Sequence, residues 1–182
     1  MRIKLVVPLM LLALWACASA PDINYYTLDM SPSGKVETAV NLVVGKFATT
    51  ESLGRSQILI HTSPTRIEYY ATDRWAAGVG ELVERKLAAE FGPSVEGRPS
   101  LKVTGRVIAF GQRDEATGVK ARVELAVVIR DGQAKSYEDP LLQKTYEVTR
   151  NADGPMPDAV VEALSAAMEE IAAEIAADAA AL

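Results

Sequence analysis

Three stretches of the chain alternate between apolar and polar side chains with period two. They are Leu101–Phe110, Val119–Ile129 and Leu141–Thr149. In the second stretch one side is entirely apolar and comprises Val119, Ala121, Val123, Leu125, Val127 and Ile129. Such alternation is typical of antiparallel strands in a sheet that is covered on one face. The polar segment 111–118 and the pair Asp131-Gly132 predict the loops between these strands.

Three further strand patterns precede them. Val40–Phe47 is apolar and rich in β-branched residues, which is typical of a central strand. Gln57–Thr62 and Arg66–Ala71 are separated by Ser63-Pro64-Thr65, and this arrangement predicts a hairpin. A short strand is expected at Tyr25–Leu28, ahead of a turn at residues 31–34.

Apolar residues between residues 73 and 91 recur at helical spacing. The stripe consists of Trp75, Val79, Leu82, Val83, Leu87 and Phe91, so we expect a helix over Asp73–Phe91. Thr72 or Asp73 can cap its start, and Gly92-Pro93 ends it. Gly78 and Gly80 lie inside this segment, where we expect a strand backbone to pack closely against the helix. A phosphate-binding loop is the alternative interpretation of Gly-x-Gly.

The C-terminal segment Pro157–Ala177 repeats apolar residues at spacings of three and four. Its seam consists of Val161, Leu164, Met168, Ile171 and Ile175. A seam this narrow and short predicts a helix packed on the sheet, with a coiled coil as the alternative. The order of elements therefore predicts an α/β (α+β) fold. We expect one compact domain, in which two main helices pack on a mixed, largely antiparallel sheet.

The N-terminus has the pattern of an export signal. Arg2 and Lys4 are followed by 12 residues, Leu5–Ala16, that carry no polar side chain. A membrane-spanning helix needs roughly 20 apolar residues, whereas this length suits a secretory signal. The segment ends in Leu14-Trp15-Ala16-Cys17, which resembles a bacterial lipobox, although Trp15 stands where a small residue is usual.

The lipobox resemblance predicts that residues 1–16 form a signal peptide and that Cys17 is lipidated. Residues 17–37 would then be a tether with a short strand, and residues 38–182 the folded domain. Ala18 follows the cysteine, and by resemblance to enterobacterial sorting this residue permits transport to the outer membrane. Ordinary cleavage after Ala20 is the alternative, and it would leave a chain without cysteine.

Composition narrows the possible functions. The chain has 19 basic and 24 acidic residues, a balance that argues against a nucleic-acid partner. Cys17 is the one cysteine, which excludes an internal disulfide and a multi-cysteine zinc site. His61 is the one histidine, so little His-based catalysis is possible. No metal or cofactor is expected.

Candidate chemistry is sparse along the rest of the chain. His61 and the neighbouring Ser63 could serve as base and nucleophile, but a histidine with a satisfied hydrogen bond at a strand end is the expected reading. Asp114-Glu115 and Glu138-Asp139 are expected in solvated loops. Two clusters of large side chains, Tyr69-Tyr70 and Arg74-Trp75, suit a protein interface or the entrance of a ligand-binding site. Packing in the core is the alternative.

A set of ordered motifs resembles the ABC-type transport auxiliary lipoproteins, the family that includes the paraquat-inducible lipoprotein C type. Cys17 is followed by Tyr25-Tyr26-Thr27-Leu28, and further matching segments occur in the same order along the chain. These segments are Val43-Val44-Gly45-Lys46-Phe47, Leu53-Gly54-Arg55-Ser56-Gln57-Ile58, Ile67-Glu68-Tyr69-Tyr70 and Arg74-Trp75. The resemblance spans nearly all of the chain after Cys17.

The resemblance implies a non-catalytic lipoprotein on the periplasmic face of the outer membrane. Such a protein works beside an ABC transporter and an Mce-type membrane protein that moves lipid or other hydrophobic cargo. A homo-oligomer of the domain is a further possible assembly. A structural or polysaccharide-binding envelope lipoprotein without a transporter partner, or a periplasmic hydrolase, is the alternative. For the partner surface we nominate Tyr69, Tyr70, Arg74 and Trp75, followed by Tyr25 and Tyr26. Arg74 is expected to face outward from the first turn of the helix.

Overall fold

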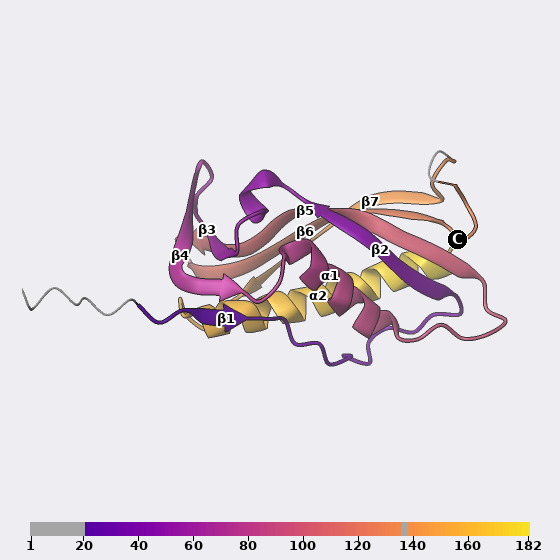
Figure 1. Ribbon diagram of the computed structural model, residues 1–182, viewed down its shortest axis with the longest axis horizontal. Helices are drawn as coiled ribbons and strands as arrows, with labels where there is room; N and C mark the ends of the chain where they lie inside the picture. The colour runs from indigo at the N-terminus through magenta and orange to yellow at the C-terminus, as the bar shows by residue number, and fades with distance from the viewer. Residues whose placement is uncertain (1–20, 136–137) are drawn as a thin grey trace, which may run out of the picture.

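Figure 1 shows the computed structural model of the chain, which describes residues 21–135 and 138–182. The predictions for residues 1–16 and for Cys17 concern a part of the chain outside the described residues. Within the described part, seven strands form one sheet. They are β1 (Asn24–Tyr26), β2 (Asn41–Thr49), β3 (Gln57–Ser63), β4 (Arg66–Trp75), β5 (Ser100–Glu115), β6 (Gly118–Asp131) and β7 (Leu142–Asn151). The helices are η2 (Glu51–Leu53), α1 (Val79–Phe91) and α2 (Pro157–Ala180).

The sheet is mixed, as predicted. Its strand order is β1-β4-β3-β5-β6-β7, and β2 pairs with β5 beside this path. The longest pairings, β5 with β6 and β6 with β7, are antiparallel. β1 runs parallel to β4, and both β2 and β3 run parallel to β5. Strand β5 is therefore shared by three neighbours, with β2 along its first half and β3 along its second.

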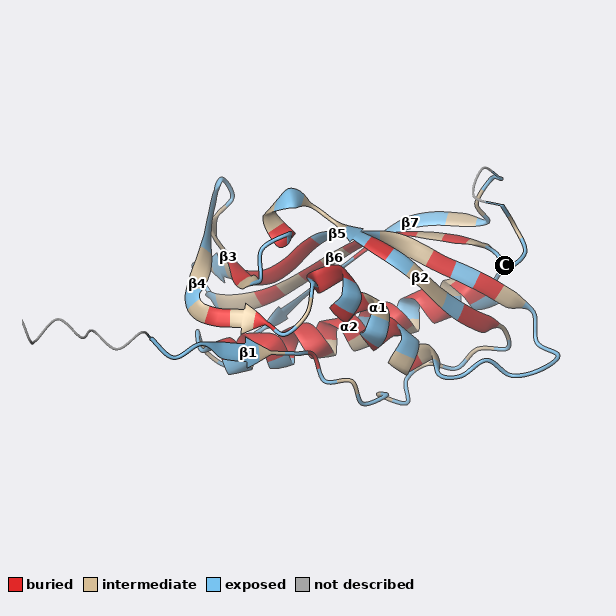
Figure 2. Ribbon diagram, in the orientation of Figure 1, coloured by how far each residue is buried: buried red, intermediate tan, exposed pale blue. Residues whose placement is uncertain are grey.

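Both α-helices lie on the same face of the sheet (Figure 1). Helix α1 packs mainly on β2, whereas α2 packs on β6 and β7, as the seam predicted. The core lies between these layers (Figure 2). Its buried members include Ala121, Val123, Leu125, Val127 and Ile129 of β6, and Leu164, Met168, Ile171 and Ile175 of α2. No helix in the described part of the chain is long and apolar enough to span a membrane.

Helix α1 begins at Val79, so the predicted start at Asp73 is wrong. Residues 72–75 continue β4 because β1 supplies hydrogen-bonding partners for its last residues. The strand alternates there, since Asp73 and Trp75 are buried while Arg74 between them is half-buried. Asp73 does not cap the helix, because its carboxylate accepts hydrogen bonds from the Asn24 amide (2.8 Å) and the Thr72 hydroxyl (3.1 Å). Gly78 is the N-cap residue and makes no side-chain cap.

The predicted loop at residues 111–118 is also wrong in its length. Strand β5 continues to Glu115 and β6 starts at Gly118, so two residues make the turn. The polar residues stay extended because β3 and β6 flank this part of β5 on both sides. Asp114 and Glu115 therefore lie in a strand, where Glu115 pairs with Lys120 at 2.7 Å. Glu138 lies in the loop between β6 and β7, as predicted.

The close approach predicted at Gly80 is confirmed. A Cβ atom at this position would collide with the backbone carbonyl oxygen of Phe47 in β2. The first turn of α1 consequently packs directly on the strand backbone, and a larger residue would force helix and strand apart. The close approach predicted at Gly78 is wrong, because a Cβ atom there would meet no heavy atom within 4 Å. Of the Gly-x-Gly pattern at residues 78–80, Gly80 therefore reflects helix–sheet packing and Gly78 does not.

Candidate docking surface

The six nominated residues all lie on the neighbouring strands β1 and β4. The parallel register places Tyr25 opposite Arg74 and Tyr26 opposite Trp75. Tyr69 and Tyr70 lie earlier in β4, where Tyr69 is opposite Leu59 of β3. The structure therefore joins the two sequence clusters into one strip, although its members differ widely in exposure.

Trp75 belongs to the core. Its side chain is 3% exposed, and its ring centroid lies 5.3 Å from that of Phe110 in a tilted arrangement. Trp75 ends β4 rather than beginning a helix, yet it still points toward the interior as its apolar stripe indicated. It cannot contact a partner, so the nomination of Trp75 for the partner surface fails on geometry.

Tyr70 and Tyr26 are also tied to the domain. The Tyr70 hydroxyl lies within hydrogen-bond distance of the Gln112 side-chain oxygen and of the Pro155 carbonyl oxygen (3.0 Å for the latter). Burial, with Asp114 and Asp73 nearby, raises the pKa of Tyr70 to about 12. Burial, with Asp158 and Asp73, likewise raises the pKa of Tyr26. Both side chains are therefore partly enclosed by the domain.

Tyr69 is half-buried and carries an arginine on its ring. Its hydroxyl donates to the Ser52 carbonyl oxygen at 3.0 Å, and the Arg55 guanidinium carbon lies 4.8 Å from the ring centroid. Arg55 itself is exposed. Stacked arginine and tyrosine are the residue types that dominate binding energy at interfaces. Sequence reasoning missed Arg55 as a partner of Tyr69, because the contact joins the loop between η2 and β3 to strand β4.

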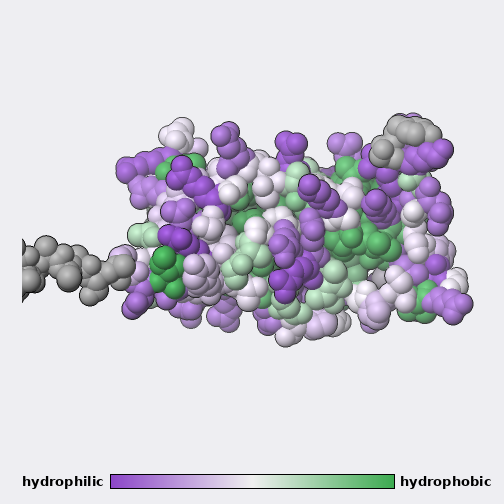
Figure 3. Space-filling model, viewed as in Figure 1, coloured by the Kyte–Doolittle hydropathy of each residue, from purple (hydrophilic) through white to green (hydrophobic). Residues whose placement is uncertain are grey.

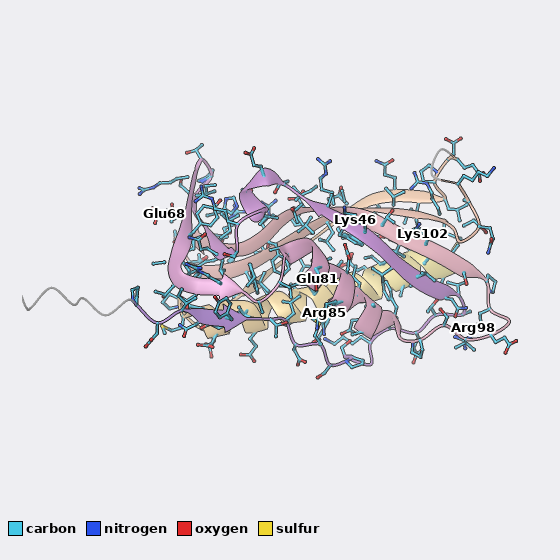
Figure 4. All side chains as sticks on the ribbon, viewed as in Figure 1. Lys46, Glu68, Glu81, Arg85, Arg98 and Lys102 are labelled. Atoms are coloured by element: carbon cyan, nitrogen blue, oxygen red, sulfur yellow. The ribbon has the colours of Figure 1, made fainter. Side chains whose placement is uncertain are left out.

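An open depression of about 510 Å³ lies beside this stack. Strand β2, the η2 segment and the start of α1 form its walls, and Lys46, Leu53, Arg55 and Gly78 are among its lining residues. Figure 4 shows Lys46 on β2 at this side of the molecule. The depression combines two basic side chains with apolar wall positions, which suits a protein partner that offers acidic and apolar groups.

Arg74 differs from its predicted position. It lies on β4 rather than on a helix, and it is half-buried. Its Nε atom is buried and has no hydrogen-bond partner among the described residues. Tyr25, directly opposite on β1, is 65% exposed. Of the nominated residues, Tyr25 is therefore the one that presents most of its ring to the surroundings.

The chain after β1 crosses the helical layer instead of running free. This crossing segment (residues 27–36) buries Leu28 in the core. The Asp29 backbone N–H donates to the Ser165 hydroxyl at 3.1 Å, and Lys86 donates to the Ser31 carbonyl oxygen at 3.0 Å. Lys35 pairs with Glu169 at 2.7 Å. The crossing segment is thereby fastened to both α1 and α2.

A buried ion pair on α1 binds the crossing segment through hydrogen bonds to Ser31 and Ser33. Lys86 and Glu90 lie one turn apart on α1, 2.7 Å from each other, and both side chains are 0% exposed. Burial acts to raise the pKa of Glu90, but hydrogen bonds from Lys86 and from Ser33 outweigh it, so the pKa is lowered. Sequence reasoning missed this pair because its spacing is also that of an ordinary surface pair.

His61 lies on β3, beside a second open depression of about 410 Å³. Burial and the cations of Arg122 and Arg113 lower the pKa of His61. Among the described residues His61 forms no hydrogen bond with a serine hydroxyl or a carboxylate. The described part of the chain also holds no group of three residues with metal-binding side chains.

The comparisons with known proteins agree on family and fold. The model of the ABC-type transport auxiliary lipoprotein component matches residues 26–176. The fold resembles that of protein XCC0632 from Xanthomonas campestris, a DUF330 family member, with a TM-score of 0.71 and 16% identity over 88% of this chain and 95% of that one.

A second crystal structure, of an uncharacterized protein, gives a TM-score of 0.65 at 16% identity and covers 87% of this chain and 99% of that one. Among curated proteins, none matches this sequence. At such low identity the two structures establish the fold alone, whereas the family model covers most of the chain. The chain belongs to the family of ABC-type transport auxiliary lipoprotein components.

Proposed function

We propose that this protein is a non-catalytic lipoprotein anchored through Cys17 to the periplasmic face of the outer membrane. There it works beside an ABC-type transporter and an Mce-type membrane protein that moves lipid or other hydrophobic cargo. The family match over residues 26–176 carries this proposal. The lipobox ending in Cys17 supports the anchor, because several acyl chains hold a protein on a membrane durably where one would not.

The anchor is tested by replacing the lipid-bearing residue. Cys17→Ala should release the protein from the membrane fraction and abolish incorporation of a radioactive acyl label. Trp15→Ala is the matched control, because it changes the same segment but keeps the cysteine, and it should stay membrane-bound. A Cys17→Ala protein that remains in the outer-membrane fraction as firmly as the wild type would contradict the proposal.

The docking surface for the transporter component is centred on Arg55 and Tyr69. The guanidinium stacked on a half-buried ring is held in place, so little side-chain entropy is lost when a partner binds. The adjoining depression adds Lys46 and the apolar Ala48, both of which are exposed. An acidic and apolar surface of an Mce-type protein fits this combination.

Arg55→Glu should reduce site-specific crosslinking to the Mce-type protein. Lys102→Glu is the control, because this substitution makes the same change of charge. Lys102 lies on β5 and does not line the depression (Figure 4). Thermal melting of both variants checks that the domain stays folded. Undiminished crosslinking of a folded Arg55→Glu protein removes this surface as the docking site. Crosslinking to an envelope polysaccharide, with no transporter component captured, would favour the structural lipoprotein.

A further inference from the structure

The described chain begins at one end of the elongated domain, and that end exposes apolar side chains. We propose that this end rests on the phospholipid bilayer, with Ile23, Tyr25 and Met156 in the headgroup region. The inference rests on the proposed lipidation of Cys17 and adds a direct contact between protein and lipid. Ile23, Tyr25 and Met156 together form the apolar tip.

The apolar tip is assembled from two parts of the chain that are distant in sequence. Ile23 immediately precedes β1, and Met156 immediately precedes α2. Both elements begin at the same end of the molecule (Figure 1). The hydrogen bond from Tyr70 on β4 to the Pro155 carbonyl oxygen joins the loop before α2 to the strand that pairs with β1.

Each member of the apolar tip exposes a large fraction of its surface to solvent. Ile23 is 42% exposed, Tyr25 is 65% exposed and Met156 is 63% exposed. Figure 3 shows a small green patch next to the start of β1, within a surface that is otherwise mostly hydrophilic at this end. Tyrosine is enriched at membrane interfaces because its ring is apolar and its hydroxyl can stay in water. Isoleucine and methionine beside it provide apolar area for shallow insertion.

The length of chain before the described residues decides which surface reaches the membrane. Four peptide units separate Cys17 from Pro21, and fully extended they span about 14 Å. Helix α2 starts at the apolar tip and, with 24 residues, is about 36 Å long. An anchor at Cys17 therefore keeps the apolar tip near the bilayer and leaves the opposite end beyond its reach. Arg98 marks that opposite end in Figure 4.

The attachment point cannot easily move along the domain. β1 is paired in the sheet, and the crossing segment behind it is held by buried Leu28 and by bonds to Ser165 and Lys86. Lengthening the tether would require unpairing β1 and removing Leu28 from the core. The domain is consequently presented to the membrane by the same end in each molecule.

The charges around the apolar tip indicate which lipid it suits. Asp22, Asp153 and Asp158 are exposed within three residues of its members. Arg74 is the cation opposite Tyr25, and it is half-buried. Three carboxylates repel an anionic surface, so contact should depend on apolar insertion into zwitterionic phospholipid rather than on attraction to anionic headgroups.

The contact is tested with the acylated full-length protein, in which Cys17 is consumed by lipid. Single cysteines are introduced as Ile23→Cys, Tyr25→Cys or Met156→Cys and labelled with an environment-sensitive fluorophore. Glu96→Cys, exposed in the loop at the opposite end, is the control. Proteins are reconstituted in vesicles of phosphatidylethanolamine and phosphatidylcholine that contain a lipid-attached quencher, with acylation checked by mass spectrometry.

We expect a blue-shifted emission and quenching at positions 23, 25 and 156, and neither at position 96. Adding phosphatidylglycerol should reduce the quenching at the apolar tip. Quenching that is absent at all four positions, in protein that is acylated and floats with the vesicles, would overturn the contact while leaving the lipid anchor intact. A protein that is not acylated and does not float would overturn the anchor and this inference together.

Discussion

The buried Lys86–Glu90 pair offers the sharpest test of how the crossing segment is held. Lys86→Met removes the ammonium but nearly preserves the volume, so Glu90 keeps its burial and loses its cation. Breaking a buried pair in this way costs about 3–5 kcal/mol, because one charge remains in the interior without its partner. The Ser31 carbonyl oxygen also loses its donor. Against a typical stability of about 5–15 kcal/mol, this is a large fraction of the total.

A double-mutant cycle separates the pair from its surroundings. Glu90→Gln keeps an acceptor for the Ser33 N–H and hydroxyl donors, so the double variant Lys86→Met/Glu90→Gln buries no charge. We expect it to be more stable than the sum of the single effects predicts, with a coupling of about 2–3 kcal/mol. Arg85→Met is the control: Arg85 and Glu81 share the same spacing on α1, but both are more than half exposed, and their 3.9 Å contact contributes little.

Urea unfolding at neutral pH, followed by the fluorescence of buried Trp75, measures each free energy of unfolding. A pH series adds a second readout. In the wild type Glu90 has a lowered pKa, so its contribution is present above the ordinary value of 4.5 and is lost as pH falls through the folded pKa. In Lys86→Met, burial would raise the pKa of Glu90, so the deficit should shrink on acidification. A Lys86→Met variant no less stable than Arg85→Met, or strictly additive effects, would refute this account.

Three further substitutions test the packing and the titration. Trp75→Ala should cost about 3–5 kcal/mol in urea unfolding followed by circular dichroism, because it empties a core position against Phe110; a loss below about 1 kcal/mol would contradict its burial. Gly80→Ala should destabilise by about 1–3 kcal/mol despite the better helix propensity, because its Cβ meets the Phe47 carbonyl, and an increased melting temperature would refute that contact. The raised pKa of Tyr70 means that the unfolded chain loses this proton first, so stability should fall as pH rises from 10 toward about 12. Tyr70→Phe should lessen that fall, and an unchanged alkaline profile would argue against the phenol's burial.

The elements that could be predicted from the sequence are those whose pattern is local. The alternation along β6 and the seam of α2 each report a single covered face, and both faces are buried as expected. The start of α1 could not be predicted in the same way. Residues 73–75 are extended because β1, 49 residues earlier in sequence, pairs with them, and no local pattern records such a partner.

For the candidate surfaces, too, the sequence shows the residue types but not the tertiary contacts that decide their exposure. Sequence analysis found the aromatic residues but could not separate Trp75, in the core, from Tyr25, which is largely exposed. The role proposed for Arg55 depends on its contact with Tyr69, and that of Met156 on α2 starting at the same end of the domain as β1. The buried state of Lys86 is set by the crossing segment, which covers a helix face that would otherwise be solvated. Each of these depends on tertiary contacts between separate elements.

The position of β5 determines when the polypeptide can fold. β2 and β3 both find their parallel partner in β5, which follows them by 50 or more positions in the chain, and β6 covers the other edge of β5 along its whole length. A nascent chain that ends before residue 100 therefore carries strands with open edges, a state prone to self-association. Because loop closure must precede these pairings, folding should be slow and cooperative. A chain delivered N-terminus first would need protection from aggregation until β5 and β6 have followed.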